Sequence, residues 1–132
     1  MLKITPEQLE AFKTRPPEGM LELSRQHLKT HLPDYIKGID PEILDRMIHN
    51  ALVRGIRRGI RQGEDMIGFV ALSFQYGPNF DEQGHIKSLL GQYQNEHTPF
   101  LPQVVAKTSD ADWKEAQDAY DSSAWFSEAN SA

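Results

Sequence analysis

The longest helical pattern in the chain begins at Asp40, where a capping residue, a first-turn proline and Glu42 suit the start of a helix. Apolar and small residues then recur every three or four positions, as on a helix face that packs on a core. They are Leu44, Met47, Ile48, Ala51, Leu52, Gly55, Ile56 and Gly59. We expect a helix that reaches about residue 62, with Gly63 as its C-terminal cap.

Two glycines inside this predicted helix need a physical reason. Each glycine costs about 1 kcal/mol relative to alanine in an exposed helix. Gly55 and Gly59 therefore predict that another backbone approaches closely at these positions. A helix that bends at its glycines is the alternative.

The segment that follows, residues 64–76, carries apolar side chains on nearly every side, which is typical of a helix at the centre of a domain. A buried strand is the competing interpretation. We favour the helix because the apolar run is long for a strand, follows the acidic turn Glu64-Asp65 and stops at Gly77-Pro78.

Further helical patterns on both sides predict an all-α fold. They cover residues 5–15, 18–32 and 85–95, a turn or helix over residues 98–105, and a last helix that starts with the capping pair Ser109 and Asp112. We expect a compact single-domain bundle of five or six helices over residues 1–121, with a long third helix and an apolar central fourth helix. Residues 122–132 are expected to fray. Within this tail, the pair Trp125-Phe126 is expected to fold back on the body, and binding a partner is the alternative.

Composition limits the classes of protein that the chain can belong to. The 132-residue sequence has no cysteine, which excludes disulfides, thiolate metal sites and thiol catalysis. No stretch approaches the roughly 20 apolar residues that a membrane helix needs, and the N-terminus lacks the apolar core of a signal peptide. We expect a soluble cytoplasmic protein without membrane insertion.

Charge is unevenly divided along the chain. Residues 1–63 contain 11 lysines and arginines against 8 acidic residues, whereas residues 64–132 contain 3 against 11. This distribution favours electrostatic steering toward a protein partner. A net charge of −5, without interleaved basic and aromatic residues, disfavours nucleic acid binding.

Four arginines occupy one face of the predicted long helix. Arg54, Arg57, Arg58 and Arg61 stand at positions i, i+3, i+4 and i+7. One interpretation is a solvated face that pairs with the acidic C-terminal half of the chain. The other is a docking surface for an acidic partner, and we take these arginines as candidate partner-binding residues.

The sequence contains no residue set that identifies a reaction. His27 and His31 are one helical turn apart, but no further ligands at metal-binding spacing accompany them. Asp81 and Glu82 follow a sharp turn, where acidic residues more often cap the next segment or face water than act in catalysis. We therefore expect no catalytic residues, no metal and no cofactor.

Three motifs carry a resemblance to a known group of proteins. They are Glu42-x-Leu44, Gly59-Ile60-x-x-Gly63-Glu64-Asp65-Met66, and Phe69-Val70-x-Leu72-x-Phe74-x-Tyr76-Gly77-Pro78-Asn79-Phe80-Asp81. With them, the chain resembles small helical proteins encoded beside spike proteins, adaptor chaperones and toxins of bacterial type VI secretion systems. The resemblance covers about residues 1–105. It implies an accessory role in toxin loading within a bacterial cytoplasm, and not catalysis.

The leading hypothesis is a non-catalytic interaction protein, an accessory factor or co-chaperone that helps an adaptor chaperone deliver a toxin to the secretion spike. The four arginines would dock electrostatically, and Tyr76, Phe80 and Asp81 would form a contact on the turn. The alternative is an immunity protein whose acidic surface covers a basic toxin site. Its candidate residues are Asp110, Asp112, Glu115, Asp118 and Asp121. An uncharacterised enzyme is the third hypothesis.

Overall fold

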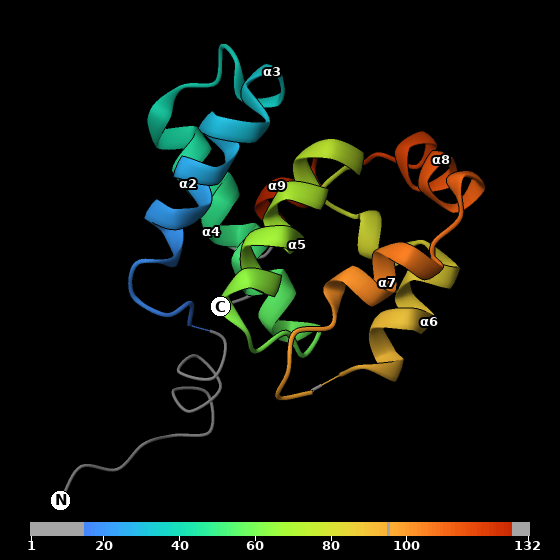
Figure 1. Ribbon diagram of the computed structural model, residues 1–132. Helices are drawn as coiled ribbons and strands as arrows, with labels where there is room; N and C mark the ends of the chain where they lie inside the picture. The colour runs from blue at the N-terminus through green and yellow to red at the C-terminus, as the bar shows by residue number, and fades with distance from the viewer. Residues whose placement is uncertain (1–14, 95, 128–132) are drawn as a thin grey trace, which may run out of the picture.

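The computed structural model describes residues 15–94 and 96–127, and every regular element within them is a helix (Figure 1). Helix α5 (Gly63–Tyr76) lies at the centre, where α2, α3, α4, α7 and α8 contact it. The predicted central helix is confirmed, and the strand alternative is wrong. The helix predicted over residues 5–15 lies outside the described residues, apart from Arg15.

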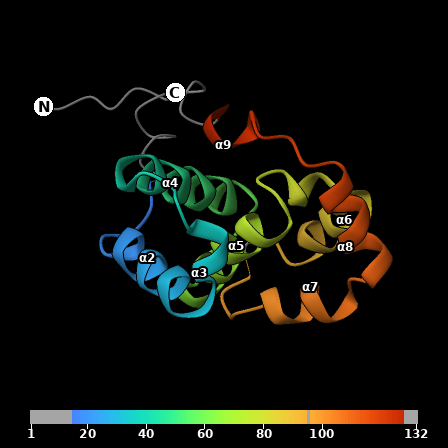
Figure 2. The ribbon, with the colours of Figure 1, turned by 90° about the horizontal axis from the view of Figure 1, so that it is seen from above.

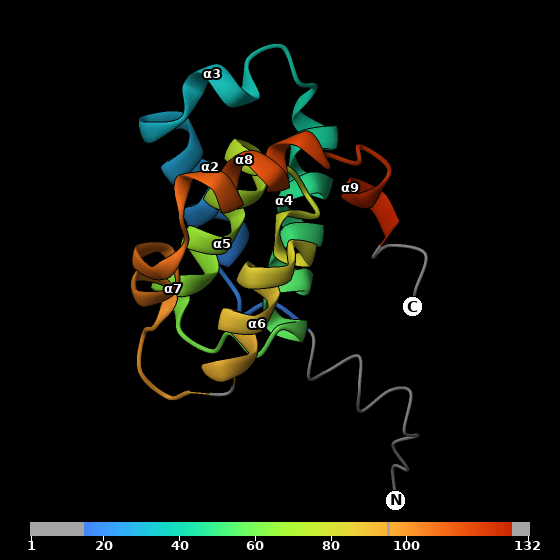
Figure 3. The ribbon, with the colours of Figure 1, turned by 90° about the vertical axis from the view of Figure 1, so that its right-hand side faces the viewer.

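The other helices lie on two sides of α5 (Figure 2). On one side are α2 (Met20–His31), the short α3 (Pro33–Ile36) and α4 (Pro41–Arg57). On the other are the 3-10 helix η1 (Phe80–Glu82), α6 (Gly84–Gln92), α7 (Leu101–Lys107) and α8 (Asp110–Asp118). Figure 3 views the molecule from the side of α6, α7 and α8. The chain then returns to α4 through α9 (Ala124–Ser127).

One hydrophobic core joins the two sides. Leu28 of α2, Ile48 and Leu52 of α4, Ile86 of α6 and Val104 of α7 are each at most 1% exposed. These residues belong to a single cluster around the buried face of α5. The helical spacing of apolar residues therefore turns one face of each segment to the same interior.

Helix α4 begins as the sequence predicts and ends earlier. The Asp40 side chain accepts a hydrogen bond from the backbone N–H of Glu42 at 3.0 Å, which caps the first turn. The last helical residue is Arg57, so the predicted end near residue 62 is wrong. At 17 residues, α4 is nevertheless the longest helix in the described part of the chain.

Gly59 explains why α4 stops early. Its φ of +91° is a left-handed conformation that glycine adopts without a Cβ clash. The N–H of Gly59 donates to the Ile56 carbonyl at 3.0 Å, and that of Ile60 donates to the Gly55 carbonyl at 3.1 Å. This pair of bonds is the Schellman helix ending. Gly59 is thus the C-terminal stop, and Gly63, the predicted cap, is the first residue of α5.

The prediction that another backbone approaches Gly55 is wrong, because a side chain of α5 lies there instead. A Cβ placed on Gly55 would lie 3.2 Å from the Cγ and Cδ1 atoms of Phe69 on α5. An aromatic ring, not a backbone, therefore occupies the space that a larger residue would need.

The C-terminal aromatic pair folds back on the body, as predicted. Trp125 is 6% exposed, and its ring centroid lies 4.7 Å from that of Phe74. The buried Asn50 side chain donates to the Trp125 carbonyl at 2.9 Å, and the Arg46 guanidinium lies 5.0 Å from the Phe126 ring. The predicted frayed tail is therefore wrong over residues 124–127, because these aromatic contacts hold α9 on α4. Residues 128–132 lie outside the described part of the chain.

The all-α class is confirmed, whereas the helix count is not. Between residues 15 and 127, leaving out residue 95, eight α-helices and one 3-10 helix are present instead of five or six. Two of them, α3 and α9, are four residues long, too short to produce a recognisable period. None of the described helices has both the length and the apolar composition to cross a bilayer.

Candidate functional site

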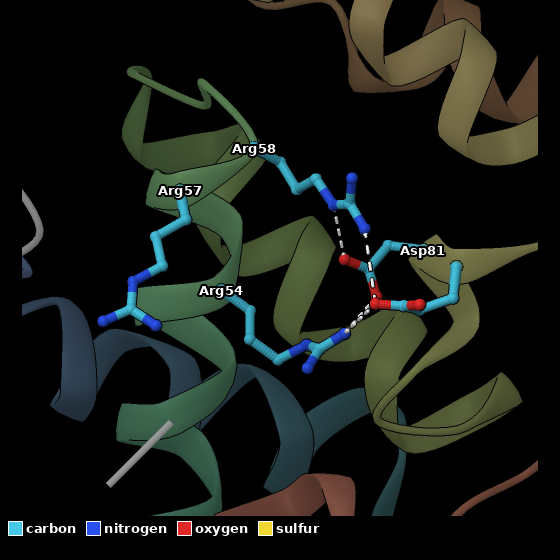
Figure 4. A pocket seen from close by; sticks show the side chains of 5 residues that line it. Arg54, Arg57, Arg58 and Asp81 are labelled. Atoms are coloured by element: carbon cyan, nitrogen blue, oxygen red, sulfur yellow. Dashed lines mark hydrogen bonds and ion pairs between the residues drawn. The ribbon is translucent and has the colours of Figure 1, made fainter. Parts of the chain in front are cut away.

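The four candidate arginines do not share one helix face. Arg54 and Arg57 lie on α4, Arg58 is its C-terminal cap, and Arg61 follows the helix. Figure 4 shows Arg54 and Arg58 converging on Asp81, while Arg57 points away from it. Arg61 turns back over the end of α4, where its Nη1 donates to the carbonyls of Ile56 and Ile60, both at 3.2 Å. Because α4 ends at Arg57, the four arginines do not follow one another along a helix face as their spacing predicts.

Arg54, Arg58 and Asp81 form a buried ion-pair cluster, called here the Asp81 junction. Arg54 Nη2 donates to Asp81 Oδ1 and Arg58 Nε donates to Asp81 Oδ2, both at 2.7 Å. The Asp81 side chain is 2% exposed, and those of Arg54 and Arg58 are 10% and 24% exposed. Because each carboxylate oxygen has its own guanidinium partner, the buried charge is compensated in the folded state.

An open pocket of about 230 Å³ lies beside this junction. Arg57 and Glu82 line it together with the three junction residues. The Glu82 carboxylate is 60% exposed and lies 3.8 Å from Arg54 and 3.7 Å from Arg58. Arg54 and Arg58 therefore meet acidic side chains of this chain, which matches the interpretation of internal pairing for these two arginines.

In the turn that carries Asp81, each residue has its own structural role. Gly77 has a φ of +120°, which a side chain would oppose. Asn79 binds the end of α8, because its Nδ2 donates to the Ala119 carbonyl at 2.9 Å and its Oδ1 accepts from the Asp121 N–H at 3.0 Å. The Phe80 ring packs into the core, with its centroid 4.9 Å from that of Phe69.

The predicted turn contact therefore has little exposed surface. Phe80 and Asp81 are each 1% exposed, so they offer a partner no surface in the folded chain. Tyr76 is half-buried and stacks on Trp113, with ring centroids 4.3 Å apart. The structure brings Arg54, Arg58 and Asp81 together for stability, and the binding role of the arginines stays a prediction.

A second feature, an apolar groove, opens between α5 and α7 at the surface. Its volume is about 400 Å³. The groove is lined by Glu64, Asp65, Gly68, Ala71, Leu72, Gln75, Leu101, Pro102, Val105 and Ala106. Ala71, Leu72 and Leu101 form a buried floor, whereas Pro102, Val105 and Ala106 form an exposed lip on α7. The volume of this α5–α7 groove lies in the range of ligand pockets, and its lining is mostly apolar.

Asp65 fixes the two walls of the groove relative to one another. Its buried carboxylate accepts hydrogen bonds from the backbone N–H groups of Phe100, at 2.7 Å, and Leu101, at 3.3 Å. These are donors at the start of α7 that no helical carbonyl can reach, and a negative charge there also suits the helix dipole. Asp65 thus holds α7 beside α5, and both of its carboxylate oxygens are used for this purpose.

Gly68 contacts α7 closely through the Leu101 side chain. A Cβ on Gly68 would lie 2.9 Å from Leu101 Cδ2, closer than such atoms approach. A larger residue at position 68 would therefore require the end of the Leu101 side chain to move.

The groove contains no set of catalytic or metal-binding side chains. Among the described lining residues, only Glu64 and Asp65 are charged, and Asp65 is committed to α7. Across the described ranges, no three histidines and carboxylates gather closely enough to hold a metal ion. His27 and His31 stack with ring centroids 4.6 Å apart, and burial, followed by the nearby His31, lowers the pKa of His27.

The acidic residues proposed for an immunity role lie on and just after α8. Asp110, Glu115 and Asp118 are exposed. Asp112 is instead used within the fold, because it completes a capping box with Ser109 and lies 2.6 Å from the His85 ring nitrogen. The exposed acidic face of α8 is therefore real, but smaller than the sequence suggests.

Sequence reasoning missed the groove because none of its residues is chemically conspicuous. The available signal was a pair of small residues, Gly68 and Ala71, on a helix that is apolar on nearly all sides. Only the tertiary position of α7 shows that this face of α5 is partly uncovered. Comparison with known proteins adds no constraint, since no protein-family model, curated protein or solved structure matches the chain.

Proposed function

We propose that the chain is a non-catalytic protein-binding domain that acts as an accessory factor in loading a toxin of a type VI secretion system. The observation that supports a binding role is the α5–α7 groove, an open and mostly apolar depression on the surface. The secretion context rests on the resemblance carried by residues 59–66 and 69–81.

A binding role accounts for the exposed lip of the groove. Val105 is 39% exposed and lies beside the exposed Pro102 and Ala106, above an apolar floor. Single exposed apolar residues are ordinary, but a continuous patch that lines a depression is typical of an interaction site. A partner that covers the patch gains the free energy of removing it from water.

A reconstituted loading assay tests this proposal. The adaptor chaperone, toxin and spike encoded near this chain are mixed with and without it, and the toxin bound to the spike is quantified. We expect the chain to increase loading and Val105→Lys to abolish the increase. Ile43→Lys is the matched control, because Ile43 is a β-branched residue, 44% exposed, that lies on α4 outside the groove. Equal loading with and without the chain would contradict the accessory role.

The alternative function is an immunity protein, favoured by the exposed carboxylates of α8. Such a face could cover a basic toxin site through complementary charge. In this case, expression of the chain would protect cells from the toxin, and Asp110→Lys with Glu115→Lys would remove protection. Protection without any effect on loading would replace the accessory role by the immunity role.

A further inference from the structure

We propose that the α5–α7 groove binds an amphipathic helix of a partner protein, with an apolar face in the groove and a lysine or arginine beside Glu64. This inference rests on the proposed protein-binding function and adds the chemistry of the partner. Its basis is the shape, lining and charge of the groove.

The groove is a trough between two helices. On α5, the lining residues Glu64, Gly68, Ala71, Leu72 and Gln75 follow one helical face, and α7 forms the second wall. Eleven residue steps along α5 correspond to about 16 Å, or three helical turns. The α7 lining residues span five steps, or about 7.5 Å. A third helix that lies along this face of α5 can place side chains against it at positions i, i+3, i+4 and i+7 and meet α7 over part of its length.

The volume of the groove points to a helix that is buried on one face only. A helix about 16 Å long and 10 Å wide occupies about 1,300 Å³, several times the groove volume of about 400 Å³. The groove therefore admits the apolar side chains of one face, while the opposite face stays in water. The small floor residue Ala71 lets the incoming backbone approach closely, and Leu72 and Val105 supply apolar contacts.

Charge favours a basic partner. Glu64 is exposed at one end of the groove, forms no ion pair among the described residues, and has no lysine or arginine beside it in the lining. A basic side chain near Glu64 would be attracted by its carboxylate, whereas an acidic segment would be repelled.

Site-specific photo-crosslinking identifies the occupant. A photo-crosslinking residue is placed at position 105 in the groove, or at position 43 outside it, and the full chain is expressed with its neighbouring genes. We expect position 105 to cross-link a partner segment with helical apolar spacing and at least one lysine or arginine. A cross-link to a second copy of this chain, or to a small apolar molecule, overturns the inference. So does a yield at position 105 that does not exceed the yield at position 43.

Titration of the cross-linked segment, made as a synthetic peptide, tests its charge and its helical form. We expect the peptide to gain helical circular dichroism on binding and Glu64→Lys to weaken binding by about threefold to tenfold. Glu115→Lys carries the same charge change on α8, outside the groove, and should have less effect. Equal weakening by both variants would indicate general attraction to an acidic chain and would overturn the contact at Glu64.

The two proposals fail in different ways. A basic amphipathic helix from a protein unrelated to secretion would support the groove chemistry and contradict the loading role. A loading partner that cross-links through an extended or acidic segment would contradict the groove chemistry and leave the loading role in place.

Discussion

The Asp81 junction holds its charged side chains inside the fold, whereas the α5–α7 groove exposes apolar side chains at the surface. At the junction, two arginines and a carboxylate that is 2% exposed satisfy one another at 2.7 Å. At the groove, Val105 is 39% exposed and lies on an apolar lip with the exposed Pro102 and Ala106. In the first region, charged groups of this chain pair with one another, and in the second, apolar side chains stay exposed to water.

This difference shows that a conspicuous sequence feature can belong to the interior of the fold. Arginines and an acidic turn attract attention because they carry charge, yet burial commits them to stability. Glycine, alanine and valine attract none, yet their arrangement leaves a depression open to a partner. Variants in the two regions should therefore separate stability from binding.

The largest expected loss of stability follows from neutralising the centre of the junction. Asp81→Asn removes the buried negative charge that Arg54 and Arg58 share at 2.7 Å, and both guanidiniums stay partly buried without it. We expect the free energy of unfolding to fall by about 2–4 kcal/mol, below the full value for a wholly buried pair because Arg58 reaches water. The urea midpoint, followed by circular dichroism, measures this change.

Glu82→Gln is the matched control for the junction. Glu82 is the next residue, is 60% exposed and lies 3.7–3.8 Å from the same arginines. An exposed pair of this kind contributes at most about 1 kcal/mol. If both variants shift the urea midpoint equally, the junction is a surface network and its contrast with the groove is lost.

A smaller loss is expected from Gly59, which ends α4 beside the junction. Gly59→Ala places a Cβ on a residue with a φ of +91°, and we expect the free energy of unfolding to fall by about 1–2 kcal/mol. Gly91→Ala should change the free energy of unfolding in the opposite direction. Gly91 is helical and exposed, and nothing lies within 4 Å of an added Cβ. That variant should gain up to about 1 kcal/mol. Equal denaturant midpoints for the two alanine variants would contradict the helix ending described here.

Much of the fold could be predicted from the sequence, because local signals set it. Asp40 and the Ser109 pair with Asp112 cap helices as expected, and the apolar run of α5 is the central helix. The misplaced end of α4 has a specific cause. Gly59 fits both the apolar helical period and the left-handed stop, and these two roles differ only in backbone conformation.

The candidate site was less predictable, because it depends on contacts between distant segments. Asp81 meets Arg54 across 27 positions of sequence, and Asp65 meets Phe100 across 35. Neither spacing follows from a helical period, so the sequence could nominate these residues but could not pair them. The groove depends on an uncovered face, which is a property of the whole fold and of no single motif.

The hydrogen bond between His85 and Asp112 is expected to make a pH-dependent contribution smaller than the junction's. The pKa of Asp112 is lowered from 3.8 to about 2, first by the His85 hydrogen bond and then by the Ser109 backbone. A lowered pKa stabilises the folded chain above pH 3.8, and this contribution is lost as the pH falls toward 2. We expect Asp112→Asn to remove this dependence of the melting temperature on pH between pH 4 and 2, and His85→Ala to reduce it in part. An unchanged profile in both variants would show that this exposed pair contributes nothing measurable.

The smallest expected effect on stability comes from the lip of the groove, and it completes the comparison. Val105→Lys changes a side chain that is 39% exposed near the end of α7, where a lysine suits both helix propensity and the helix dipole. We therefore expect the free energy of unfolding, taken from the urea midpoint, to change by at most about 0.5 kcal/mol, as in Ile43→Lys on α4. Because loading is expected to fail in the first variant only, a lost function with an unchanged midpoint would locate binding at the groove. A midpoint shift as large as that of Asp81→Asn would instead show that Val105 supports the core, and the contrast between the two regions would no longer hold.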